Sequence, residues 1–180
     1  FDLPDVFEGA ARRLGFFPGS SIGNFTRVEA AGFLEASRKI LTGPDAGFLV
    51  GVDLRKDPAI LNAAYNDAKG VTAAFNLNLL TRANRELGAD FDLDGFRHHA
   101  FYNEDEGRVE MHLISTRAQE VSIGERRFSF VADETIHTEN SYKYAPEEFQ
   151  DIARTAGYRA ERLWIDENQL FSLHYLLVDG

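Results

Sequence analysis

The sequence predicts an α/β fold in which a core with a parallel sheet is interrupted by an inserted α+β unit. Near the start, two short apolar runs flank a stretch with helical spacing, the pattern of a parallel strand–helix–strand unit. In the middle, the spacing changes to the alternation of antiparallel strands, and a helix with two closing strands follows. We therefore expect residues 1–55 and 144–180 to form the core and residues 56–143 to form the insertion.

The first core segment contains the expected parallel unit. Residues 5–13 begin with an acidic residue and end with two arginines, which matches the dipole of a short helix. Leu14–Phe17 is a short apolar strand, and Gly47–Val52 is a second one. Between them, Thr26 is a suitable N-cap, and Glu29 three residues later completes a capping box. The pattern predicts a capped helix that joins two parallel strands.

The insertion and the closing segment follow in order. Apolar spacing predicts two helices and then two antiparallel hairpins in the insertion, over residues 58–65, 72–87, 95–102, 108–117, 119–123 and 127–131. Pro146 begins the last helix, and Gly157 ends it. Residues 159–165 and 170–178 then form the two closing strands.

Composition excludes several classes of site and partner. The chain of 180 residues has no cysteine, which rules out disulfides, thiolate zinc sites and a cysteine nucleophile. Its net charge of −10 disfavours a nucleic-acid partner. No apolar run approaches the roughly 20 residues that span a bilayer, and the start does not resemble a signal peptide. We expect a cytoplasmic protein that acts on a small molecule.

Two further kinds of catalytic site find no support in the sequence. The five histidines show neither the H-x-x-x-H nor the H-E-x-x-H spacing, and they scatter over the predicted strands. We therefore expect no metal site. A serine hydrolase is equally unsupported, because no G-x-S-x-G elbow is present.

The most informative stretch runs from Phe16 to Phe25. An apolar strand ends there in a turn that contains proline, two glycines and two serines, and Asn24 follows the turn. A buried parallel strand presents backbone N–H groups and one polar side chain to a ligand in this way, at its carboxyl end. The stretch predicts a ligand site at this edge of the sheet.

Four segments, taken in order, resemble one enzyme family. They are Gly19–Asn24, Tyr65–Asp67 with Phe75-Asn76, Val109–Leu113 and Ile136–Tyr144. The set is similar to the histidine-specific methyltransferases of ergothioneine biosynthesis, which trimethylate the α-amine of free L-histidine. The resemblance implies S-adenosylmethionine as cofactor. It also implies that the fold is the C-terminal part, strands 4 to 7, of a Rossmann-like class I methyltransferase fold.

The resemblance assigns a role to individual residues. It implies that Asn24 binds the amine and carboxylate of the substrate at the reacting centre, and that Tyr65 donates to the carboxylate. Met111 would lie against the substrate ring. Glu139 and Ser141, two residues apart in an extended segment, would bind the two imidazole nitrogens, because a carboxylate accepts from one and a hydroxyl donates to or accepts from the other.

The same resemblance places part of the cofactor site in the turn. Gly19, Ser20 and Ser21 would approach S-adenosylmethionine or the substrate through backbone groups. Most of the cofactor site is expected upstream, because no G-x-G-x-x-G occurs here, so this chain alone is expected to be inactive. The strand at Leu14–Phe17 would lack its upstream neighbour, so we expect a second chain or self-association to cover that edge.

Alternative interpretations remain open for each candidate. Asn24 could cap the following helix, Tyr65 and Met111 could be core residues, and Glu139 with Ser141 could face solvent on an edge strand. A structural tight turn explains the Gly-Ser-Ser run nearly as well. For the whole protein, the alternatives are the same chemistry on another aromatic amino acid, or a non-catalytic module that binds an amino acid.

Overall fold

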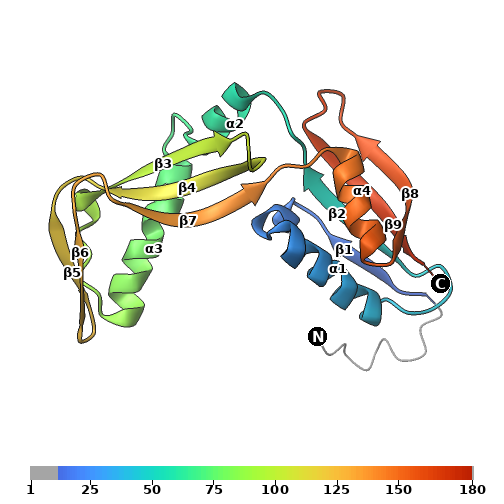
Figure 1. Ribbon diagram of the computed structural model, residues 1–180, viewed down its shortest axis with the longest axis horizontal. Helices are drawn as coiled ribbons and strands as arrows, with labels where there is room; N and C mark the ends of the chain where they lie inside the picture. The colour runs from blue at the N-terminus through green and yellow to red at the C-terminus, as the bar shows by residue number, and fades with distance from the viewer. Residues whose placement is uncertain (1–11, 180) are drawn as a thin grey trace. The chain divides into compact units, whose positions relative to one another are not determined.

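The computed structural model describes residues 12–179, which divide into two compact units (Figure 1). Of these residues, 12–56 and 141–179 belong to one unit, and Asp57–Asn140 form the other. Most of the short helix predicted at residues 5–13 lies outside the described residues. Within the described part of the chain, no helix is long and apolar enough to cross a membrane.

The first unit is built on a four-stranded sheet with the order β1-β2-β9-β8. β1 (Leu14–Phe17) pairs in parallel with β2 (Gly47–Asp53), which confirms the predicted parallel unit. β9 (Phe171–Val178) lies antiparallel to both β2 and β8 (Tyr158–Ile165). A parallel pair followed by an antiparallel strand is the arrangement that the resemblance implies for the end of a class I methyltransferase sheet.

Two helices pack on this sheet and on each other: α1 (Arg27–Ile40) and α4 (Pro146–Thr155) (Figure 1). α1 begins at the predicted capping box, in which the Thr26 hydroxyl accepts from the Glu29 N–H at 3.2 Å and the Glu29 carboxylate accepts from the Thr26 N–H at 2.8 Å. The buried core between helices and sheet includes Leu34, Phe48, Val50, Val52, Phe149 and Tyr158.

The second unit consists of two helices, a three-stranded sheet and a separate hairpin (Figure 1). Its elements are α2 (Pro58–Tyr65), α3 (Val71–Leu87), β3 (Phe96–Asn103), β4 (Arg108–Ser115), β5 (Gln119–Ile123), β6 (Arg126–Phe130) and β7 (Thr135–Tyr142). β3 and β4 are antiparallel, and β7 joins the sheet beside β4. β7 was not among the predicted strands, although its residues 139–141 were expected to be extended.

In both helices of this unit, an acidic side chain accepts at least one hydrogen bond from a backbone N–H group of the first turn. Asp57 accepts from the Ala59 N–H at 2.7 Å, and Pro58 occupies the first turn of α2. Asp67 accepts from the N–H groups of Val71 and Thr72 at the start of α3. Hydrogen bonds from Thr72 and then Val71 lower the pKa of Asp67 to about 2.

Candidate active site

The turn after β1 lies close against β2 because Gly19 in the turn and Gly51 in β2 permit it. Gly19 has a φ of 78° and Ser20 a φ of 60°, both in the left-handed region. A Cβ atom on Gly51 of β2 would lie 3.1 Å from the Gly19 nitrogen and 2.7 Å from the Phe171 ring. The glycine at position 51 therefore leaves room for the turn, which ends in a short 3₁₀ segment (Ser21–Asn24).

The last two residues of β7 lie against this turn in the first unit. A Cβ atom on Gly23 would lie 2.7 Å from the Tyr142 carbonyl oxygen and 3.6 Å from the Ser141 hydroxyl oxygen. Asn24 follows directly and is exposed. Two predicted site residues, Asn24 and Ser141, therefore belong to segments that are in contact.

The interpretation of Asn24 as the cap of the following helix is wrong. The N-cap of α1 is Thr26, whose hydroxyl makes the capping bond. Asn24 is instead the last residue of the 3₁₀ segment. Its role as a substrate ligand stays a prediction.

A buried lysine connects Ser141 to the end of β2. The Lys143 side chain is 1% exposed, and its ammonium lies 2.7 Å from Asp53 Oδ2 and donates to Ser141 Oγ at 2.8 Å. The backbone N–H of Asp53 donates to Ser20 Oγ at 2.8 Å. These contacts form a continuous series of polar interactions from the Gly-Ser-Ser turn to Ser141.

Tyr65 and Met111 come together in the second unit. Met111 is buried with Leu61, Ala100 and Val109, and Tyr65 packs against this cluster from the end of α2. The Tyr65 carbonyl oxygen lies 2.8 Å from His98 Nε2. Met111 is thus a core residue of this unit, and the proposed contact with a substrate ring stays a prediction, as does the role of the Tyr65 hydroxyl.

Glu139 and Ser141 lie in an extended segment, as predicted for two residues that would bind the two nitrogens of an imidazole. Both lie in β7, two residues apart, so their side chains leave the strand on the same side. Glu139 is half-buried and Ser141 is buried. A fully solvent-facing pair, the alternative interpretation, is therefore wrong for Ser141.

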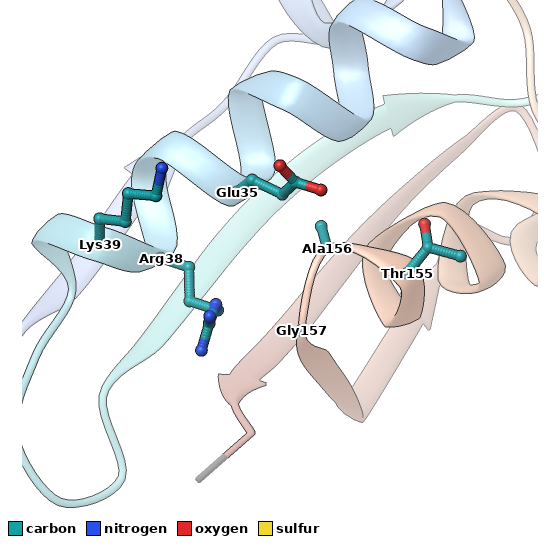
Figure 2. A pocket seen from close by; sticks show the side chains of 6 residues that line it. All are labelled: Glu35, Arg38, Lys39, Thr155, Ala156 and Gly157. Atoms are coloured by element: carbon teal, nitrogen blue, oxygen red, sulfur yellow. The ribbon is translucent and has the colours of Figure 1, made fainter.

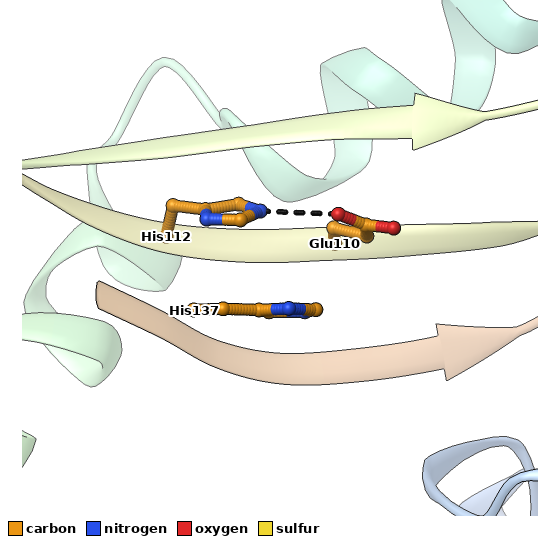
Figure 3. Close-up of side chains that lie close together, drawn as sticks. All are labelled: Glu110, His112 and His137. Carbon is orange, nitrogen blue, oxygen red and sulfur yellow. Dashed lines mark hydrogen bonds and ion pairs between the residues drawn. The ribbon is translucent and has the colours of Figure 1, made fainter. Parts of the chain in front are cut away.

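Two histidines and a glutamate come together on β4 and β7, contrary to the expectation that the histidines scatter. One ligand atom from each of Glu110, His112 and His137 lies within 4.8 Å of the others (Figure 3). The rings of His112 and His137 are stacked, with centroids 4.5 Å apart and an angle of 20° between planes. The sequence could not show this, because the position of β7 beside β4 was not predicted.

The contacts within this cluster are those of a hydrogen-bonded network of charged and polar side chains. Glu110 Oε1 accepts from Arg108 at 2.8 Å and from Asn103 at 3.1 Å, and Oε2 lies 3.2 Å from His112 Nε2. Burial alone would raise the pKa of Glu110, but the hydrogen bonds from Arg108, His112 and Asn103 together lower it. An imidazole binds a metal through an in-plane lone pair, so stacked rings do not converge on one ion.

A separate hollow of about 180 Å³ lies between the last turn of α1 and the turn that joins α4 to β8 (Figure 2). It is lined by Glu35, Arg38, Lys39, Thr155, Ala156 and Gly157. Its charges have both signs, and it includes no predicted site residue. Arg38 approaches the backbone of Gly157, where a Cβ atom would lie 2.9 Å from the Arg38 side chain. We assign no ligand to this hollow.

Sequence reasoning missed Asp53 and Lys143 as members of the candidate site. The available signal for Asp53 was a carboxylate directly after a buried strand, at the end where parallel strands present ligand groups. For Lys143 it was a charged residue between two tyrosines, Tyr142 and Tyr144, all three of which are buried. A lysine in such surroundings needs an anionic partner, which predicts an ion pair without identifying the partner.

Comparison with known proteins identifies the family of this chain. Residues 2–178 match the family described as "Histidine-specific methyltransferase, SAM-dependent". The chain is 45% identical over 164 residues to the histidine N-alpha-methyltransferase of Mycolicibacterium smegmatis, a match that covers 90% of this chain and 51% of that protein. It is 38% identical over 161 residues to ergothioneine biosynthesis protein 1 of Neurospora crassa, which covers 88% of this chain and 18% of that protein.

A solved structure shows the same fold. The CcbJ methyltransferase from Streptomyces caelestis is 13% identical, with a TM-score of 0.51 over 100% of this chain and 61% of that chain. The chain spans about half the length of the mycobacterial relative. Because the family match extends over nearly every residue, the chain belongs to the histidine-specific, S-adenosylmethionine-dependent methyltransferases.

Proposed function

We propose that the full-length protein transfers methyl groups from S-adenosylmethionine to the α-amine of free L-histidine, as a step in ergothioneine biosynthesis. Family membership supports this proposal. The structural observation that carries it is the contact of the Gly19–Asn24 turn with the end of β7 at Gly23 and Tyr142. That contact brings the segments of Asn24 and Ser141 together.

Each proposed ligand has chemistry suited to histidine. The Asn24 amide offers both a donor and an acceptor, so it suits an amine and a carboxylate without adding charge. The hydroxyl of Tyr65 would donate to the carboxylate. Glu139 and Ser141 would bind the two imidazole nitrogens, and Met111 would contact the ring.

The turn after β1 fits a role beside the cofactor. Gly19 is exposed, and no atom lies within 4 Å of the position that a Cβ atom would take, so a ligand can approach its backbone. Ser20 Oγ already accepts from Asp53, so we expect Ser20 and Ser21 to contribute mainly backbone groups. S-adenosylmethionine, when bound, supplies an electrophilic methyl group on a sulfonium.

The chain's residues would then position the amine for in-line attack. Attack requires a lone pair, so the ammonium of histidine must first lose a proton, and a nearby sulfonium disfavours a second cation. Holding the amine at Asn24 turns the encounter into a reaction within one complex.

The test is mass spectrometry of histidine after incubation with S-adenosylmethionine and the full-length protein. Products heavier by one, two and three methyl groups are expected. Methylation of tryptophan but not histidine would keep the chemistry and overturn the roles of Glu139 and Ser141. No methylation of either would favour a module that binds an amino acid without catalysis.

Two other features of the proposal follow from the sequence. We assign residues 1–55 and 144–180 to the methyltransferase core and residues 56–143 to an inserted substrate-binding domain.

The family's biosynthetic chemistry on a free amino acid supports a cytoplasmic location. Fractionation of cells that express the tagged full-length protein tests the location, and recovery with membranes would contradict it.

A partner is proposed for the edge of the sheet at β1. Leu14 and Phe16 are 60% and 66% exposed on this edge strand. Apolar edge strands of this kind tend to pair with another strand. We predict that the 180-residue chain self-associates or binds a second chain through β1. Size-exclusion chromatography with light scattering tests this, and a stable, well-dispersed monomer would count against it.

A further inference from the structure

Lys143 carries a charge that burial alone would make very unfavourable. Its side chain is 1% exposed, and a buried ammonium needs both an opposite charge and hydrogen bonds. Asp53 Oδ2 supplies the charge at 2.7 Å, and Ser141 Oγ accepts a hydrogen bond at 2.8 Å. Within the first unit, this ammonium therefore lies between the end of β2 and the segment proposed to bind imidazole.

Asp53 is itself held in place by other contacts. Its backbone N–H donates to Ser20 Oγ, and its Oδ1 pairs with the Lys56 ammonium. Asp53 pairs in register with Phe171, opposite it on β9. The carboxylate that holds Lys143 therefore extends from the last residue of β2, and Lys143 links that residue to Ser141.

The direction of the hydrogen bond decides how Ser141 can act. A lysine ammonium only donates, so it uses a lone pair of the Ser141 hydroxyl and turns the hydroxyl proton away from itself. A hydroxyl that accepts from a charged donor is also polarised, which makes it a better donor. Ser141 is thereby prepared to donate to an unprotonated imidazole nitrogen, while Glu139 accepts from the protonated one.

We propose that Lys143 is the positioning residue for histidine recognition, and that it acts by fixing and polarising the Ser141 hydroxyl. The inference rests on the proposed function, because it takes Ser141 as an imidazole ligand. The inference also specifies the protonation state of the bound substrate, which is the neutral imidazole, whose unprotonated nitrogen accepts from Ser141. Lys143 does not touch the substrate in this arrangement.

A double-mutant cycle in the full-length protein tests the proposal. Histidine binding is measured by calorimetry for wild type, Lys143→Met, Ser141→Ala and the double variant. Lys143→Met alone is expected to weaken histidine binding about tenfold, the effect of losing one charge-assisted hydrogen bond. In the Ser141→Ala background, the same change is expected to have less than about a twofold effect.

Two further variants separate positioning from general damage. Lys56→Met removes the other ammonium from Asp53 but leaves the hydrogen bond from Lys143 to Ser141 in place, so it should weaken histidine binding less than Lys143→Met does. Lys143→Gln keeps a donor but no charge, and we expect a loss of about threefold that again vanishes without Ser141. If Lys143→Met does not fold, Lys143→Gln replaces it in the double-mutant cycle. In steady-state kinetics, Lys143→Met should raise KM for histidine while KM for S-adenosylmethionine stays unchanged.

The outcomes distinguish this inference from the proposed function. If wild type neither binds nor methylates histidine, the proposed function fails, and the inference fails with it. If wild type binds histidine but Lys143→Met has the same effect with and without Ser141, the inference alone is overturned. It is also overturned if Ser141→Ala leaves histidine binding unchanged, or if Lys56→Met weakens binding as much as Lys143→Met.

Discussion

At the scale of single residues, the candidate site depends on side chains two positions apart in β7. Glu139 is the proposed acceptor of the pair, and Ser141, which accepts a hydrogen bond from Lys143, is the proposed donor. A neutral imidazole presents one protonated and one unprotonated nitrogen, so this arrangement matches its two edges. An indole ring offers a single N–H and no nitrogen acceptor, so Glu139 and Ser141 should distinguish histidine from tryptophan.

Glu139→Gln in the full-length protein tests that discrimination. The amide has nearly the same shape, but the charge-assisted bond to the imidazole N–H is lost, so histidine binding should weaken about tenfold. Tryptophan binding should weaken less. Calorimetry with both amino acids measures the difference, and the exposed Glu147→Gln provides a control that should change neither. Equal losses for the two amino acids would contradict the role of Glu139 in reading the imidazole.

At the scale of secondary-structure elements, the contact between the turn after β1 and the end of β7 is made by backbone. Gly23 leaves no room for a side chain there, because a Cβ atom would lie 2.7 Å from the Tyr142 carbonyl oxygen. Backbone cannot move away as easily as the end of a flexible side chain. The two elements must therefore separate if Gly23 is replaced.

Gly23→Ala should accordingly lower the free energy of unfolding by about 1–3 kcal/mol, the usual cost of overpacking. Gly32→Ala is the matched control, because no atom lies within 4 Å of its Cβ position in the middle of α1. It should be neutral or stabilise the protein by up to about 1 kcal/mol, since alanine favours helix. Urea unfolding of both variants measures this. A Gly23→Ala variant as stable as Gly32→Ala would contradict the close contact.

Local signals predicted most of these elements, and long-range pairing explains what they missed. The capping box at Thr26 and Glu29 and the two apolar runs of the parallel unit depend on neighbours in sequence, and all were predicted correctly. β7 was missed because its polar residues show no apolar alternation, and its strand conformation comes from its place beside β4. The pairing of Asp53 with Lys143 joins positions far apart in the chain, so no local pattern specifies it.

At the scale of the whole molecule, the core of the first unit encloses an imidazole. His174 on β9 is fully buried, its Nε2 lies 3.0 Å from Ser172 Oγ, and its ring meets Phe149 edge to face. Burial lowers the pKa of His174 from 6.5 to about 4. The histidine is therefore neutral in the folded protein at neutral pH.

This burial predicts a loss of stability in mild acid. The unfolded chain binds a proton at His174 as pH falls below about 6.5, whereas the folded chain does so only near pH 4, so stability falls across that interval. Between pH 7 and pH 5 the loss assigned to His174 is about 2 kcal/mol. His174→Gln should remove that part of the slope, as measured by urea unfolding at both pH values. An unchanged slope would contradict the prediction.

The points at which the chain leaves and re-enters the first unit lie side by side. The chain leaves the first unit after Lys56 and returns at Ser141, and backbone hydrogen bonds join the segments on either side of the insertion. The Arg55 N–H donates to the Tyr144 carbonyl at 3.1 Å, and the Tyr144 N–H donates to the Asp53 carbonyl at 3.2 Å. Because these backbone hydrogen bonds hold the two ends of the insertion together, a short loop in place of residues 57–140 would be long enough to close the first unit.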